Sequence, residues 1–195
     1  ASVWTQEAKL HRSSEANFAT NVELSTDNNY AIAGSMNYGG SSKGAGIVYV
    51  RSGTSWTFQA ALVPSDVAAN DEVQSVSISS DGTYAVVGSE AENSGQGAAY
   101  VFIRSGTTWT QQAKITEPTR ENAARFGAAV KLNDAGDTLA CSSPLSDESG
   151  QTNAGAVFVF TRSGTTWSYS TFLVASDASP SDYLGGTGSG SAQNR

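Results

Sequence analysis

The sequence has very few of the residues from which disulfide frameworks and metal centres are built. Its 195 residues include one cysteine, Cys141, and one histidine, His11. A single cysteine excludes an internal disulfide, and a single histidine excludes a metal site made of several imidazoles. We expect Cys141, which lies in the apolar run 138–141, to be a small buried side chain rather than a reactive thiol.

Motifs that carry catalytic chemistry are also missing. The sequence contains neither a Gly-x-Ser-x-Gly elbow nor a phosphate-binding loop, and a Ser-His-Asp triad could use only His11, which we expect in a solvated loop. The adjacent carboxylates Asp71-Glu72 and Asp147-Glu148 point apart in an extended chain, so we interpret them as solvated charges. We therefore predict no catalytic, cofactor-binding or metal-binding residues, and no enzyme.

Positive charge and long apolar runs are scarce as well. Charged residues make up only 15% of the chain, the net charge is −7 and the isoelectric point is about 4.6. An acidic chain is a poor partner for nucleic acid or for an anionic membrane surface. No apolar stretch is long enough for a membrane span, and no Asn-x-Ser/Thr sequon is present.

What the sequence does contain is a repeat. A hexamer of Arg-Ser-Gly-Thr-Ser/Thr-Trp occurs at residues 51–56, 104–109 and 162–167, and Trp4 opens the chain in a similar context. The repeat length is about 53 residues, which is typical of propeller and solenoid units.

The hexamer predicts a tight β-hairpin. Alternating apolar residues precede it each time, and a strand-like run that begins at the Trp follows it. The glycine between them can adopt φ > 0, as a tight turn requires. We expect Trp56, Trp109 and Trp167 to bury their rings in the packing of these repeated units, and the alternative is that they are platforms for stacking sugars.

Each repeat contains about four short strands joined by small polar residues, which predicts an all-β fold of four-stranded antiparallel units. The predicted β-propeller repeats cover residues 1–186, and 187–195 form a flexible Gly/Ser-rich tail. The units run over about 4–55, 56–108 and 109–166, with a partial unit at 167–186. The segment 3–10 is predicted to be the last strand of a blade whose other strands lie elsewhere.

Several segments resemble the FG-GAP repeat, which is the blade of the integrin α-subunit propeller. They are Phe126-Gly127-Ala128-Ala129-Val130, Val86-Val87-Gly88-Ser89 and Gly155-Ala156-Val157-Phe158-Val159-Phe160. The resemblance implies a ring of about seven blades, so this chain would form a partial propeller or one assembled from several chains. The loops that match the family's calcium loops, 27–29, 79–82 and 133–137, lack its cluster of oxygen ligands. We therefore expect turns there, with calcium as the alternative.

The function predicted from these features is a non-enzymatic, extracellular or cell-surface protein with a structural or adhesive role. Its partners would be further copies or further blades, joined through strand edges into a homo-oligomer, filament or layer. Glycans or other surface proteins are the alternative partners. O-glycosylation of the Ser/Thr loops would make it a glycoprotein. The alternative is a carbohydrate-binding propeller lectin, and Tyr38 is a candidate for an isolated surface contact.

Overall fold

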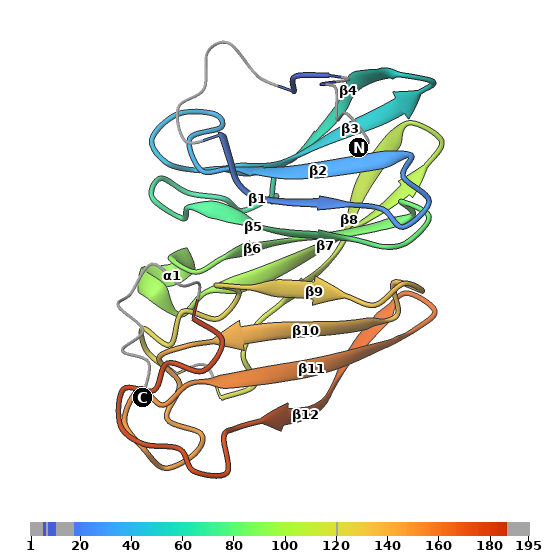
Figure 1. The fold of residues 1–195 in the computed structure, drawn as a ribbon. Helices are drawn as coiled ribbons and strands as arrows, with labels where there is room; N and C mark the ends of the chain where they lie inside the picture. The colour runs from blue at the N-terminus through green and yellow to red at the C-terminus, as the bar shows by residue number, and fades with distance from the viewer. Residues whose placement is uncertain (1–5, 7, 11–17, 120, 187–195) are drawn as a thin grey trace, which may run out of the picture.

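The computed structural model describes residues 6, 8–10, 18–119 and 121–186, and they form three four-stranded antiparallel sheets (Figure 1). The first sheet contains β1 (Phe18–Leu24), β2 (Tyr30–Ser35), β3 (Ala45–Ser52) and β4 (Ser55–Leu62). The second contains β5 (Val73–Ile78), β6 (Tyr84–Ser89), β7 (Ala98–Ser105) and β8 (Thr108–Ile115). The third contains β9 (Val130–Leu132), β10 (Thr138–Ser143), β11 (Ala156–Ser163) and β12 (Thr166–Leu173). The prediction of an all-β fold built from four-stranded antiparallel repeats is confirmed.

The strands of each sheet follow one another in chain order, and the three sheets stack face to face into an arc (Figure 1). Two apolar cores lie between them. One, with Ile32, Val48 and Leu62, joins the first sheet to the second, and the other, with Val86, Val101 and Ile115, joins the second to the third. Because side chains alternate across a strand, the middle sheet supplies one face to each core.

The predicted hairpin is present in every sheet. The turn glycines Gly53, Gly106 and Gly164 have φ of 60°, 63° and 61°, and each hexamer pairs its Arg with its Trp, as in Arg104↔Trp109. A bulge recurs at the same place in each of these hairpins, for example between Val101 and Phe102. The recurrence shows that the sequence repeat is also a repeat of backbone geometry.

The sheets and the predicted units differ by one strand. Each unit begins at a Trp, but the strand that carries that Trp (β4, β8 or β12) closes the preceding sheet. The reason is the two-residue turn, which forces the strands on its two sides to pair with each other. The longer segments after Leu62 and Ile115 instead lead to the next sheet.

The partial unit 167–186 accordingly contributes β12 to the third sheet and then continues without further strands. Of the strand predicted at 3–10, only residues 6 and 8–10 are described, and none of them is in a strand. The tail 187–195 lies outside the described residues.

Long connections and short turns lie on opposite sides of the arc, at the two ends of its strands (Figure 1). The β2–β3, β6–β7 and β10–β11 loops are on one side, together with the short helix α1 (Glu92–Gly95), and the tight turns are on the other. No helix in the described part of the chain is long and apolar enough to cross a membrane.

Candidate functional site

Two tryptophans contact the preceding sheet, one from the second sheet and one from the third. The indole Nε1 of Trp109 donates a hydrogen bond to Gln59 Oε1 (2.8 Å), and that of Trp167 donates one to Gln112 Oε1 (3.0 Å). Both rings are half-buried against the core of their junction, and Trp56 packs in the same way on the first sheet. These contacts support the packing interpretation of the three rings.

Arginines of the same hexamers make a second contact across each junction. The guanidinium of Arg104 lies over the ring of Tyr30 at 4.4 Å, and that of Arg162 lies over Tyr84 at 4.0 Å. Gly82 leaves room for Tyr30, because a Cβ there would lie 2.2 Å from the ring. We call the Trp–Gln and Arg–Tyr pairs together the junction clamp.

The receiving half of the clamp is absent from the third sheet. Tyr30 and Tyr84 open β2 and β6, whereas Thr138 opens β10. Gln59 and Gln112 lie three residues after their Trp, and Ser170 occupies that place after Trp167. The free face of the third sheet therefore differs from the corresponding faces of the first two.

The turns that match calcium loops use their carboxylates on neighbouring protein groups. Asp27 Oδ1 accepts hydrogen bonds from Ser25 Oγ (2.5 Å) and Asn29 N (2.9 Å), and Asp81 accepts from Ser79 and Thr83. Partial burial opposes ionisation of Asp81, but these hydrogen bonds outweigh it and lower the pKa of the carboxyl group. This is turn chemistry, as the sequence predicts.

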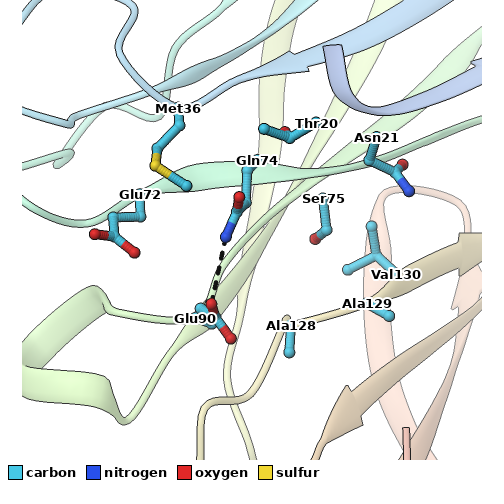
Figure 2. Close-up of a pocket in the computed structure, with 10 residues that line it drawn as sticks. All are labelled: Thr20, Asn21, Met36, Glu72, Gln74, Ser75, Glu90, Ala128, Ala129 and Val130. Atoms are coloured by element: carbon cyan, nitrogen blue, oxygen red, sulfur yellow. Dashed lines mark hydrogen bonds between the residues drawn. The ribbon is translucent and has the colours of Figure 1, made fainter. Parts of the chain in front are cut away.

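A pocket of about 610 Å³ opens where the first strands of the three sheets come together (Figure 2). Three segments of polar or small residues line it. They are Thr20 and Asn21 of β1, Glu72, Gln74 and Ser75 at the start of β5, and Ala128, Ala129 and Val130 before and at the start of β9. Met36 and Glu90, which follow β2 and β6, complete the lining.

A polar network that joins exposed and buried side chains lies near the junction of the first and second sheets. The ammonium of Lys114 bonds to Asp66 Oδ2 (2.6 Å) and Glu92 Oε1 (2.8 Å) and lies 5.5 Å from the centre of the Tyr100 ring. Burial opposes protonation of Lys114, but its two carboxylate partners raise the pKa of its ammonium group. Burial, followed by the charge of Asp66, raises the pKa of Tyr100, so the phenol stays protonated.

The residues considered from the sequence are dispersed. Cys141 is fully buried, as predicted, and burial raises the pKa of its thiol. Asp71 is buried and accepts a hydrogen bond from Ala68 N (2.6 Å), and Asp147 accepts one from Asn153 N (2.6 Å). Tyr38 packs against a buried cluster of the first sheet. His11 lies outside the described residues.

The sequence matches a known family of repeats. The FG-GAP repeat profile matches residues 56–102 and 109–160. The chain belongs to the FG-GAP repeat family. The three sheets are four-stranded β-propeller blades, as the resemblance implied.

Solved structures with the same fold are β-propellers of low sequence identity. A protein of Bacteroides uniformis provisionally described as a 6-phosphogluconolactonase shares 17% identity at a TM-score of 0.54, over 79% of this chain and 40% of its own. A Bacteroides fragilis protein with the same provisional description shares 11% at 0.56, over 80% of this chain and 38% of its own. A Lactobacillus plantarum protein shares 18% at 0.54, over 79% of this chain and 40% of its own. This chain thus spans about two fifths of these propellers, and no curated protein matches it.

Proposed function

We propose that this FG-GAP chain is a non-enzymatic structural or adhesive module, acting at a cell surface or outside the cell, that assembles with further copies of itself. The last blade of one copy would pack on the first blade of the next. One observation supports the proposal: positions that are buried at the two internal junctions are exposed on the two end faces of the arc.

On the first blade these positions lie in the inner strand. Val22 and Leu24 are 65% and 55% exposed, whereas the residues in the same places of the next two inner strands are buried. Those residues are Val76 and Ile78 in β5 and Val130 and Leu132 in β9. The middle of this face is already covered, since Ile47 and Tyr49 are buried and Leu10 and Phe18 pack against them.

On the last blade the corresponding position is at the end of the outer strand. Leu173 of β12 is 56% exposed, whereas Leu62 of β4 and Ile115 of β8 are buried. The segment 183–185 already contacts the last blade in the place where Val73 and Phe126 contact the first two blades. Apart from this segment, the two end faces are the two halves of a junction that occurs twice inside the molecule. A second copy supplies the missing half at each end, and such head-to-tail contacts produce either closed rings or open filaments.

The contact between copies should be weaker than the internal junctions. Thr138 and Ser170 stand where the first two blades carry the receiving half of the junction clamp, so this contact would rest on apolar burial. We therefore expect assembly that depends on concentration rather than a permanent complex.

Family membership supports the absence of catalysis and the surface location. The lactonase-like neighbours are only 11% and 17% identical to this chain, so they support the fold and not a shared reaction.

Light scattering of the full chain over a range of concentrations tests the proposal. We expect the mass to rise above 20.1 kDa with concentration, and we expect the double variant Val22→Glu/Leu24→Glu to remain a monomer. The matched control, Thr54→Glu/Thr107→Glu, adds the same charge in exposed hairpin turns and should assemble like the natural chain. Unchanged assembly of the Val22/Leu24 variant would refute the proposed face.

A further inference from the structure

We infer that the pocket at the start of the inner strands binds a basic side chain, lysine or arginine, presented by a protein partner. The pocket lies on the side of the arc that carries the long loops, where β1, β5 and the segment that leads into β9 converge (Figures 1 and 2). Segments from all three blades line it, so a single inserted side chain would contact every blade.

One wall of the pocket is acidic. Glu72 and Glu90 both line it, and neither of them forms an ion pair with a cation in the described part of the chain. Glu90 Oε1 accepts one long hydrogen bond, from Gln74 Nε2 (3.3 Å), as Figure 2 shows. Ionised carboxylates only accept hydrogen bonds, so these two groups favour a cationic donor such as an ammonium or guanidinium group.

The remaining lining is apolar or neutral. Met36, Ala128, Ala129 and Val130 contribute methyl, methylene and thioether groups, and Gln74 and Asn21 contribute amides. Lysine and arginine carry a charged head on an aliphatic stem, so they match a cavity that combines an apolar wall with carboxylates. None of the described lining residues is aromatic, which disfavours a sugar stacked on a ring.

The acidic pair belongs to the second blade and is not a feature of every repeat. Glu72 precedes Val73, which bridges to Gly44, and Arg125 precedes Phe126, which bridges to Gly97 in the same way. Both residues have left-handed backbones, with φ of 56° and 60°. The fold therefore imposes the backbone conformation, and the side chain at this position sets the charge of each junction.

The position of Glu90 also varies. Met36 follows β2 and Pro144 follows β10, in the places where Glu90 follows β6. The second blade thus supplies both carboxylates of the cavity. This site is separate from the end faces proposed for assembly, so either proposal can fail without the other.

The test is a titration of the isotope-labelled full chain, followed by amide chemical shifts. The probe is the tripeptide acetyl-Gly-Lys-Gly-amide, and the matched neutral peptide carries Gln in place of Lys. We expect shifts from the lysine peptide that concentrate at residues 20–21, 72–75 and 128–130, and no such shifts from the glutamine peptide.

Variants separate the pocket from general acidity. Glu72→Gln/Glu90→Gln should weaken binding of the lysine peptide at least about tenfold, since it removes both charged acceptors but keeps the side-chain shapes. The control Glu148→Gln/Asp177→Asn removes two charges elsewhere and should change affinity less than about twofold, because remote surface charges are screened.

Three results would overturn the inference. They are equal affinity in the pocket variant and the control, shifts scattered over the acidic surface, and binding of spermidine without binding of the lysine peptide. The last result would assign the pocket to a free polyamine instead of a protein side chain.

Discussion

Two glycines within strands lie against the backbone of the neighbouring blade. A Cβ on Gly34 would lie 1.9 Å from the carbonyl oxygen of Gln74, and one on Gly88 would lie 2.2 Å from that of Gly127. Backbone cannot move aside as a flexible side chain can, so these positions set the distance between blades. They explain why the second strand of the first two blades ends in Gly-Ser.

Substitution of Gly34 tests this packing. We expect Gly34→Ala to lower the free energy of unfolding by at least about 3 kcal/mol, because two strands must separate to admit the methyl group. Gly53→Ala is the control, since no atom lies within 4 Å of its added Cβ. It should cost only about 1 kcal/mol, from its left-handed φ. Urea unfolding measures the free energy of unfolding of both variants. Equal losses of stability in the two would contradict the proposed role of Gly34 in blade packing.

Glu117 provides a test that depends on pH. Its side chain is almost fully buried, at 1% exposure, and burial raises the pKa of its carboxyl group although Ser143 opposes the shift. A carboxyl group whose folded-state pKa is raised favours folding when protonated, and this contribution is lost as pH rises through that pKa. Ionised Glu117 therefore destabilises the fold at neutral pH.

We expect Glu117→Gln to raise the free energy of unfolding at pH 7.5 by an amount on the order of 1 kcal/mol. The gain should shrink towards pH 4, where the natural side chain becomes protonated. Thermal unfolding at both pH values measures this gain in stability. The control is Asp177→Asn, which changes an exposed carboxylate. A gain of the same size at both pH values would show that charge burial is not its cause.

The sequence was sufficient to predict the burial or packing of some of these residues but not of others, for physical reasons. Burial of Cys141 and packing of the three repeated Trp rings followed from periodicity, which marks the buried face of a strand. The interpretation of Asp71 as a solvated charge was wrong, because Asp71 is buried, and burial by segments far apart in the chain leaves no local pattern. The change from Gln59 and Gln112 to Ser170 was visible in the aligned repeats, but its meaning required the blade junction.

Among the elements, the outer strand of each of the first two blades has two roles. It closes its own sheet through the hexamer hairpin, and it carries the Gln that receives the Trp of the next blade. The first role was predicted from the tight turn. The unit boundaries placed at each Trp follow the sequence repeat, whereas blade boundaries lie one strand later, because the tight turn pairs the Trp strand with the strand before it.

The contribution of the junction clamp to stability can be measured by removing the side chain that accepts the Trp109 hydrogen bond. Gln59→Ala should destabilise the fold by about 1 kcal/mol, because the Trp109 indole loses its hydrogen-bond partner. Ser170→Ala, at the same place of the last blade, should have almost no effect in the monomer. If both substitutions have the same effect on chemical unfolding, the clamp does not contribute to blade packing.

At the scale of the whole molecule, the described residues form a three-blade arc with two unlike end faces. Periodicity and turn chemistry were sufficient to predict its blades, because they are local properties of the sequence. The occupant of each end face is not encoded in any local pattern, so the head-to-tail contact is a proposal drawn from the exposure of Val22, Leu24 and Leu173.

Mixing two blocked chains tests this contact most directly. One chain carries Val22→Glu/Leu24→Glu and retains only its last-blade face, and the other carries Leu173→Glu and retains only its first-blade face. Light scattering should find each variant alone as a monomer and the equimolar mixture as a dimer that grows no further. A mixture that stays monomeric, or a single variant that still assembles, would contradict head-to-tail association of the blades.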